Sequence, residues 1–384
     1  MRRLSLVREA RIPEEVFCLM SLGLTEGVVC PGLRSLHWEP HRSDDLPFFR
    51  LLLSPKLTTI SLNINTVSAE DFSILQQLIT ELGTFHLRDL RLEMPEKASR
   101  RMESAASSAV LQFGPALKKL TIYPPLSDTA IRYIMLLPNL TTWYAVNGPP
   151  RTPNLSLSNH IFPRLNHLSL AKEASFEWLT FFTIPARHIP SGQSSHPPLR
   201  HGPIERLRQL TIVPDVIIDA TFTSRIIQFR RLTSLTLKSA CYTVGGCAFK
   251  LTDDNIAEIA AALPRLEKAM LGRACPANSC QTTVTSLVSL STRCKNLRFL
   301  DIHFNTANLR EDLDSLSADL RLDSLRTVRT SNKFHLYLSK TPYTINEDDV
   351  VPVLRGFRRI FPSLVKIWGE SGPWDKLNLR LPEA

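Results

Sequence analysis

The residues whose types and spacing come closest to a chemical site are three cysteines. Four residues separate Cys275 from Cys280, and Cys294 follows, a grouping that suggests zinc. A structural zinc site takes four Cys or His ligands in paired short spacings, and no Cys or His pair completes this set. We therefore interpret the three residues as incidental reduced thiols, and we expect neither a bound metal nor a cofactor.

Other candidate chemical groups are isolated. His188, His196 and His201 lie in a stretch rich in Pro, Ser and Gly, where we expect them to be solvated. The pair Gly245-Gly246 lacks the preceding strand and the Lys-Ser/Thr of a phosphate loop. The sequence contains no G-x-S-x-G or H-E-x-x-H motif. These observations predict that the chain is not an enzyme, although an active site assembled from residues far apart in sequence is left open.

The elements that would position any site are clearest in residues 251–271, LTDDNIAEIAAALPRLEKAML. Thr252 is a favoured N-cap, and apolar residues then recur at helical spacing up to Leu263. Pro264 cannot continue a helix. Apolar residues at offsets 0, 3 and 5 from Leu266 follow, which is the L-x-x-L-x-L strand of a leucine-rich repeat.

The same offset pattern returns along the chain. The twelve first residues are Leu33, Leu57, Leu87, Leu117, Leu140, Leu165, Leu207, Leu232, Leu266, Leu297, Leu325 and Leu364. Their mean spacing is about 30 residues, long enough for one strand and one helix per repeat. In seven repeats a proline stands two residues before the first leucine. We expect each proline to end a helix and begin an extended segment.

Helices are predicted between these strands. Ser68 with Asp71, and Ser127 with Asp128, resemble N-caps of amphipathic helices that end near Leu82 and Leu137. Weaker helical patterns occupy 98–113, 175–183, 282–294 and 349–361. Residues 145–160, 303–323 and 331–347 are interpreted as excursions from the array, and 185–203 as a flexible inserted loop.

The first residues fit the same scheme. Met1, Leu4 and Leu6 match the offsets 0, 3 and 5, and Pro13 to Leu24 fit a helix leading to Leu33. A repeat array needs a polar cap over its first apolar face. We therefore expect the sequence to be a truncated product or a fragment of a longer parent.

The openings CPGLRSL, SPKLTTISL, LPNLTTW, FPRLNHLSL and FPSLVKIW, together with their irregular spacing, resemble the leucine-rich region of fungal F-box proteins. The stretch LPFFRLLLSPKLTTISL at 46–62 is especially similar to that group, and the resemblance covers essentially the whole chain. In that family an N-terminal F-box docks onto the Skp1 adaptor of a cullin ubiquitin ligase. The repeats hold the substrate.

The F-box itself is incomplete in this sequence. Residues 12–17, IPEEVF, with Met20 and Leu24, resemble the first helix of an F-box. The two later helices are missing, because repeat-like sequence starts by Leu33. We favour a repeat helix with proline at its first position, so 1–29 is predicted to be an incomplete N-terminal repeat or an F-box remnant. A Skp1-type adaptor is expected only if a complete F-box lies upstream.

Composition limits the function classes further. The sequence has 46 Lys and Arg against 36 Asp and Glu, for a net charge of +10. Its basic residues are dispersed, so nucleic-acid binding is not favoured. No apolar run is long enough to cross a membrane, and none has the pattern of a signal peptide. The seven cysteines are unevenly spread, which indicates a reducing compartment, the cytoplasm or the nucleus.

In such a fold the residues between the leucines face the concave side of the sheet. Those at offsets 4 and 6 that could bind a partner are Tyr123, Tyr144, Met270, Asp301, His303, Arg329 and Trp368. Exposed aromatic side chains on a rigid sheet are good anchors for a partner. The alternative is that these aromatics cover repeat edges or pack under inserted loops.

We therefore predict an α/β leucine-rich repeat solenoid, horseshoe-shaped, with a parallel sheet on the concave face and helices on the convex face. It would be one domain over 1–384 with about twelve irregular repeats. We expect a monomer that binds a protein substrate on its concave face, like the substrate-recognition part of an F-box component of a cullin-type ubiquitin ligase. The alternatives are a repeat scaffold with no ubiquitin link and a basic nucleic-acid-binding protein.

Overall fold

The computed structural model describes part of the chain and divides it into two compact units. The described residues are 3–6, 16, 28–40, 43–64, 72–94, 101–146, 162–171, 179, 206–213, 217–238, 249–273, 281–319, 333–338 and 347–369. Unit 1 comprises Met1–Ala174 and Ala186–Pro203, and unit 2 comprises Ser175–Pro185 and Ile204–Ala384. Each unit is described by itself, and the expectation of one continuous domain stays a prediction.

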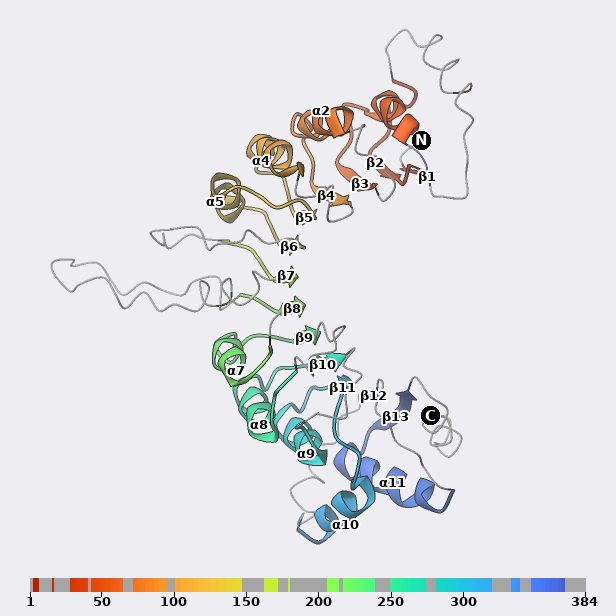
Figure 1. Ribbon diagram of the computed structural model, residues 1–384, viewed down its shortest axis with the longest axis vertical. Helices are drawn as coiled ribbons and strands as arrows, with labels where there is room; N and C mark the ends of the chain where they lie inside the picture. The colour runs from red at the N-terminus through yellow and green to blue at the C-terminus, as the bar shows by residue number, and fades with distance from the viewer. Residues whose placement is uncertain are drawn as a thin grey trace, which may run out of the picture. The chain divides into compact units, whose positions relative to one another are not determined.

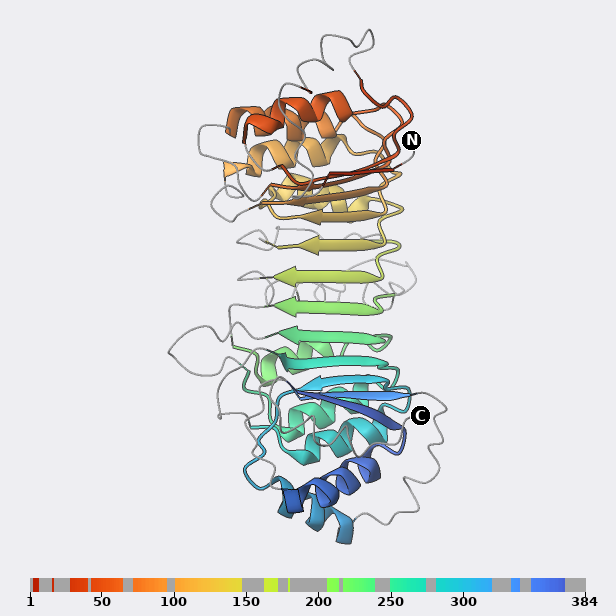
Figure 2. The same ribbon diagram turned by 90° about the vertical axis from the view of Figure 1, so that its right-hand side faces the viewer.

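The strands of each unit are parallel and follow one another in the order of the chain (Figure 2). Those of unit 1 are β1 (Arg3–Leu6), β2 (Ser35–Trp38), β3 (Thr59–Asn63), β4 (Asp89–Glu93), β5 (Lys119–Ile122), β6 (Thr142–Ala145) and β7 (His167–Ala171). Those of unit 2 are β8 (Gln209–Val213), β9 (Ser234–Lys238), β10 (Lys268–Arg273), β11 (Phe299–Ile302), β12 (Phe334–Leu338) and β13 (Leu364–Gly369).

In both units the helices lie on one side of the unit's strands (Figure 1). Unit 1 has the 3-10 helix η1 (Ser43–Leu52) and the α-helices α2 (Phe72–Leu82), α4 (Glu103–Gln112) and α5 (Asp128–Leu136). Unit 2 has α7 (Ala220–Ile226), α8 (Asp253–Ala262), α9 (Val284–Arg293), α10 (Leu309–Asp319) and α11 (Glu347–Ile360). Within a unit, each helix packs against the next. The opposite face of the strands is called the open face below.

A tight turn before the strands of the proline-marked repeats explains why the prolines and leucines recur together. The backbone N–H of Leu266 donates to the carbonyl of Leu263 at 3.2 Å, across Pro264 and Arg265. The same bond joins the first leucine to the carbonyl three residues earlier in all seven proline-marked repeats. Proline favours the second position of such turns because its φ is already set. Proline therefore begins the turn that delivers the chain to the sheet.

Two rows of apolar side chains cross the sheet of each unit on the face toward the helices. The strand register aligns the offset-3 residues and the offset-5 residues of neighbouring repeats. The offset-3 residues, each at most 3% exposed, include Leu36, Ile60, Leu90, Leu120, Trp143 and Leu168 in unit 1, and Leu210, Leu235, Ala269, Leu300, Leu336 and Ile367 in unit 2. Each fully buried leucine contributes about 1.5–3 kcal/mol. The predicted leucine-rich repeat solenoid is confirmed.

Strand and helix predictions miss several elements. Neither η1 nor α7 was predicted, and β12 lies where the sequence predicted an excursion. Strand β12 is Phe334–Leu338 and lies within the predicted excursion 331–347. The predicted strand starting at Leu325 lies outside the described residues and stays a prediction. The search for an apolar residue at offset 0 missed this strand, because the residue at that position of the repeat is Lys333. Phe334 pairs with Leu364 instead, and the register shifts by one residue after it.

The excursion predicted at 303–323 was also wrong. It contains α10, whose sequence LREDLDSLSAD is rich in acids. Among its described side chains, Leu309 and Leu313 are buried. A helix of this composition gives a weak hydrophobic period, and so sequence reasoning missed it.

Other predictions are confirmed or lie outside the described residues. Helices α2, α4, α5, α9 and α11 fall where the sequence predicted them, and β1 confirms the repeat pattern of Leu4 and Leu6. Most of the predicted helix from Pro13 to Leu24, most of 175–183, and the inserted loop 185–203 fall outside the described residues, as do Cys275, Cys280 and Arg329.

Helix α8 begins as expected and also connects to its neighbour. The Thr252 hydroxyl accepts from the backbone N–H of Asn255, whose side chain accepts from the backbone N–H of Thr252. The Asp253 carboxylate reaches α9 instead, accepting from the backbone N–H of Thr283 at 2.8 Å and from its hydroxyl at 2.7 Å. It also accepts from the Ser286 hydroxyl. Asp253 therefore joins two consecutive repeats on the helix side.

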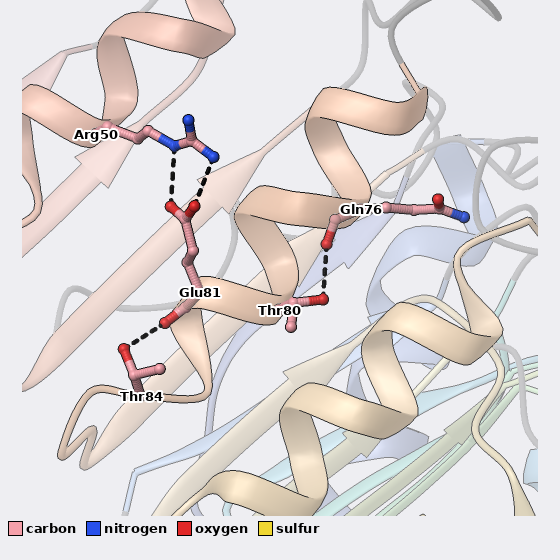
Figure 3. A network of polar contacts seen from close by, with 5 residues as sticks. All are labelled: Arg50, Gln76, Thr80, Glu81 and Thr84. Carbon is pink, nitrogen blue, oxygen red and sulfur yellow. Dashed lines mark hydrogen bonds and ion pairs between the residues drawn. The ribbon is translucent and has the colours of Figure 1, made fainter.

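An ion pair does the same in unit 1 (Figure 3). The guanidinium of Arg50, in η1, donates to both carboxylate oxygens of Glu81 in α2, with one bond of 3.0 Å from Nε. Within α2, the hydroxyl of Thr80 donates a hydrogen bond to the backbone carbonyl of Gln76 at 2.9 Å. Both ionic side chains are partly exposed, so the pair contributes at most about 1 kcal/mol.

None of the helices among the described residues has the length and apolar character that crossing a membrane requires.

We predict that Asp253→Ala destabilises the chain by about 1–3 kcal/mol, because it removes a charged acceptor from three donors of α9. Asp254→Ala is the matched control, since Asp254 is exposed in the same first turn and loses the same helix-dipole interaction. The measurement is urea unfolding followed by circular dichroism. Equal losses in the two variants would contradict the inter-repeat role of Asp253.

Candidate functional site

The open face carries the residues at offsets 2 and 4, because side chains alternate along a strand. The expectation that offsets 4 and 6 face a partner holds only for some positions. Tyr123, Tyr144 and Trp368 are half-buried. Arg329 lies outside the described residues.

Three predicted residues are buried and present little surface to a partner. Met270, Asp301 and His303 are 7%, 1% and 2% exposed. Asp301 lies in its row between Met270 and Tyr337, and neighbouring strands are only about 4.8 Å apart, so the larger side chains enclose it.

His303 is buried for a different reason. Strand β11 ends at Ile302, so His303 lies just beyond it. The His303 carbonyl accepts from the Thr282 hydroxyl at 2.8 Å, and a Cβ on Gly272 would lie 3.4 Å from the His303 Cβ. Gly272 has a φ of 79° at an irregularity in the register of β10. Its positive φ lets the strand bulge against His303.

Unit 1 carries a polar cluster on its open face, called the β4–β7 surface: Arg91, Glu93, Tyr123, Tyr144 and His167. Arg91 and Glu93, two residues apart on β4, form an ion pair. The hydroxyl of Tyr144 lies 3.3 Å from Nδ1 of His167, and their rings are 4.7 Å apart. These polar groups partner one another.

Burial and neighbouring charges set the protonation states of this surface. Burial raises the pKa of Tyr123, and the nearby negative charge of Glu93 raises it further. Burial also raises the pKa of Tyr144, while Arg91 opposes the change. Burial lowers the pKa of His167. At neutral pH these shifts favour two protonated phenols and a neutral imidazole.

Unit 2 carries a different set on its open face, called the β10–β13 surface: Lys268, Phe299, His335, Tyr337, Lys366 and Trp368. The register places Lys268 beside Phe299, Phe299 beside His335 and His335 beside Lys366 in one row. Tyr337 and Trp368 are adjacent in the next row. Strands β10 to β13 therefore bring together residues that are up to about 100 positions apart in sequence.

The side chains of the β10–β13 surface hold one another in place. The ring of Trp368 stacks on His335 with centroids 5.0 Å apart and lies 6.4 Å from the ring of Tyr337. The Lys366 ammonium lies over the Trp368 ring, 4.7 Å from its centroid. The Lys268 ammonium lies over the Phe299 ring at 5.1 Å. Phe299, His335, Tyr337 and Trp368 all stay partly exposed.

Sequence reasoning found only Trp368 of this surface. Offset 2 shares the open face with offset 4, so Lys268, Phe299 and Lys366 could have been included by the same alternation. His335 and Tyr337 were missed with β12 itself. The alternating sequence FHLYL was the signal for that strand.

The described part of the chain can be compared with the two kinds of site that its cysteines suggested, a metal site and a reactive thiol. No group of three or more His, Cys, Asp or Glu there could hold a metal ion. Cys294 is 2% exposed, and burial raises the pKa of its thiol to about 12. Its Sγ lies 3.5 Å from the Leu263 carbonyl oxygen. A thiol in this environment stays protonated and unreactive.

Comparisons with known proteins add little. No protein-family model matches the chain. No curated protein matches it either. One similar solved structure is the crystal structure of the Rad7 and Elc1 complex in yeast, which is 12% identical over 89% of this chain and 71% of that chain, with a TM-score of 0.44. A likeness of this degree carries no argument about function, and the fold assignment depends on the strands and apolar rows described above.

We predict that the His167 imidazole titrates with a midpoint below about 6.5, the value of an unperturbed histidine. Because folding lowers this pKa, His167 contributes stability that is present above about pH 6.5 and lost as the pH falls through the window below it. The measurement is an NMR titration of the imidazole signals, with His167→Gln to assign the resonance. Tyr144→Phe should keep the midpoint low, since burial is the first cause. A midpoint at or above 6.5 would contradict this environment.

Proposed function

We propose that the chain is a non-enzymatic protein-binding leucine-rich repeat module, and that its partner lies on the β10–β13 surface. The observation that carries this proposal is the gathering of Phe299, His335, Tyr337 and Trp368 on three adjacent strands, all partly exposed. Aromatic side chains dominate the binding energy of many protein interfaces. A contiguous patch of exposed apolar side chains on a protein surface is typical of an interaction site.

The sheet beneath these rings supports a binding role. Backbone bonds tie consecutive repeats, as where the N–H groups of Arg298 and Phe299 both donate to the Glu267 carbonyl, at 2.8 and 3.1 Å. Phe334, the first residue of β12, stacks on Phe361 with ring centroids 4.1 Å apart. A surface fixed before binding loses less conformational entropy when the partner arrives.

The β4–β7 surface supports the non-enzymatic part of the proposal. Tyr123 and Tyr144 have raised pKa values, which oppose ionisation of a nucleophile. The ring contact of His167 is to a phenol, and no bond from it to a carboxylate is seen in the described residues. A catalytic triad needs a carboxylate that orients the histidine base, so this surface does not support one.

A finer proposal is that this module is the substrate-recognition part of a cullin-type ubiquitin ligase. Its support is the resemblance of the repeat openings to fungal F-box proteins and of residues 12–24 to a first F-box helix. The partner on the β10–β13 surface would then be the substrate. The adaptor would attach through the F-box and not through the sheet. The alternative is a scaffold without a ubiquitin link, which would bind its protein partner on the same surface but would bind no adaptor.

The experiment is quantitative affinity capture of the chain, tagged at its own locus so that any longer product is included. We expect Tyr337→Ala with Trp368→Ala to reduce capture of a defined set of proteins by about tenfold or more. The controls are Leu136→Ala and Val351→Ala, which remove apolar side chains that are 57% and 47% exposed on helices. Captured proteins are then purified and tested directly by calorimetry.

Two outcomes would overturn parts of this account. If the double variant captures the same proteins as the unchanged chain, the β10–β13 surface is not the binding site. If a Skp1-type adaptor is absent from every capture while other partners remain, the ubiquitin proposal fails and the scaffold is left. In the ligase case the adaptor should remain bound to the double variant, because the adaptor would bind a complete F-box upstream, which the two substitutions leave unchanged.

A further inference from the structure

The partner class of the β10–β13 surface follows from its charge, an inference that rests on the binding role proposed above. In the rows at offsets 2, 4 and 6 of the described strands of unit 2, the cationic side chains include Lys238, Lys268 and Lys366. The carboxylate in those rows belongs to Asp301, which is 1% exposed. The exposed charge of this face is therefore positive.

Unit 1 provides the contrast. Its open face carries Asp89 and Glu93 on β4 beside Arg91 and Lys119, and Arg91 pairs with Glu93. Charges of both signs meet there, so it offers no field of one sign. An acidic partner is attracted to the face of unit 2 and not to that of unit 1.

The two lysines of the β10–β13 surface are held without an acid. Lys268 lies over Phe299 and Lys366 over Trp368, at 5.1 and 4.7 Å from the ring centroids. Among the described residues neither ammonium forms an ion pair with a carboxylate. A cation–π contact positions an ammonium while leaving its N–H donors available. These lysines are thus fixed and ready to pair with carboxylates from outside.

We propose that the β10–β13 surface docks an acidic, extended segment of a protein partner. One carboxylate pairs with Lys268 and a second with Lys366, while apolar or aromatic side chains between them contact Tyr337 and Trp368. The lysines stand on β10 and β13, three strand spacings or about 14 Å apart. An extended chain covers about 3.3–3.6 Å per residue. The two acids are therefore four residues apart in the bound segment.

Single-stranded nucleic acid is the competing class of ligand. Its bases bind by stacking on open ring faces. In this surface His335 stacks on Trp368, and Lys366 also lies over that ring. Phe299 lies under Lys268. Phe299 and Trp368 therefore already have an ammonium group over a ring face, and the arrangement favours carboxylates at the ammonium groups over bases between the rings.

The test uses calorimetry of the full chain with defined probes. The first is the capped peptide Gly-Glu-Leu-Tyr-Pro-Glu-Gly, whose acids are four residues apart; the second has both Glu replaced by Gln; the third is a uridine oligonucleotide. We expect saturable binding of the acidic peptide and at least tenfold weaker binding of the Gln peptide. Binding of the acidic peptide should weaken as salt is raised.

Variants of the chain locate the binding. Lys268→Gln and Lys366→Gln should each weaken the acidic peptide at least fivefold, while Lys119→Gln, an exposed offset-2 lysine of unit 1, should leave its affinity unchanged. Thermal melts check that the exposed substitutions preserve the fold. Equal binding of the acidic and Gln peptides, no binding of the acidic peptide, or tighter lysine-dependent binding of the oligonucleotide would each overturn the proposal.

The outcome is separable from that of the proposed function. If protein capture depends on Tyr337 and Trp368 but the lysine variants capture as much as the unchanged chain, the binding role stands and the acidic partner is excluded. If capture does not depend on the ring pair, both proposals fail.

Discussion

The hydrogen bond from the first leucine of a repeat to the carbonyl three residues earlier is the constraint on which the rest of the structure depends. This bond closes a turn that directs the leucine into the core. The next two backbone N–H groups then donate to a carbonyl of the preceding repeat. The N–H groups of Glu267 and Lys268 thus share the Thr233 carbonyl, at 2.8 and 3.0 Å. That ladder sets the register, and the register decides which side chains enter the core and which reach the open face. In the repeats that have this turn, it places the strand whose residues form the core and the open face.

The fixed register separates stability from function along the sequence. Residues at offsets 0, 3 and 5 are committed to the core, so the residues between them are free to differ from repeat to repeat. In unit 1 they form a polar cluster whose members, such as Arg91 and Glu93, largely satisfy one another. In unit 2 they form a platform of rings with Lys268 and Lys366 at its two ends. The same backbone therefore presents one self-contained surface and one that is suited to a partner.

Sequence reasoning recovered the fold because the determining signals are local. Pro264, Leu266 and Leu271 lie within eight residues and specify one turn and one strand. It failed at β12, where Phe334 takes over from a first-position leucine through a shift in register. It also failed to anticipate burial on the open face. The exposure of Asp301 depends on Met270 and Tyr337, which lie more than 30 residues before and after it in the sequence. The residues that lie beside a given residue on the adjacent strands can be identified only when the register of those strands is known.

The central claim is that the β10–β13 surface contacts a protein partner, and site-specific photo-crosslinking tests it most directly. A photoreactive phenylalanine analogue replaces Tyr337 in one sample and Leu136, which is 57% exposed on α5, in another. The account predicts that the analogue at Tyr337 crosslinks to a captured protein and that the analogue at Leu136 does not. Crosslinks from Leu136 with none from Tyr337 would contradict it.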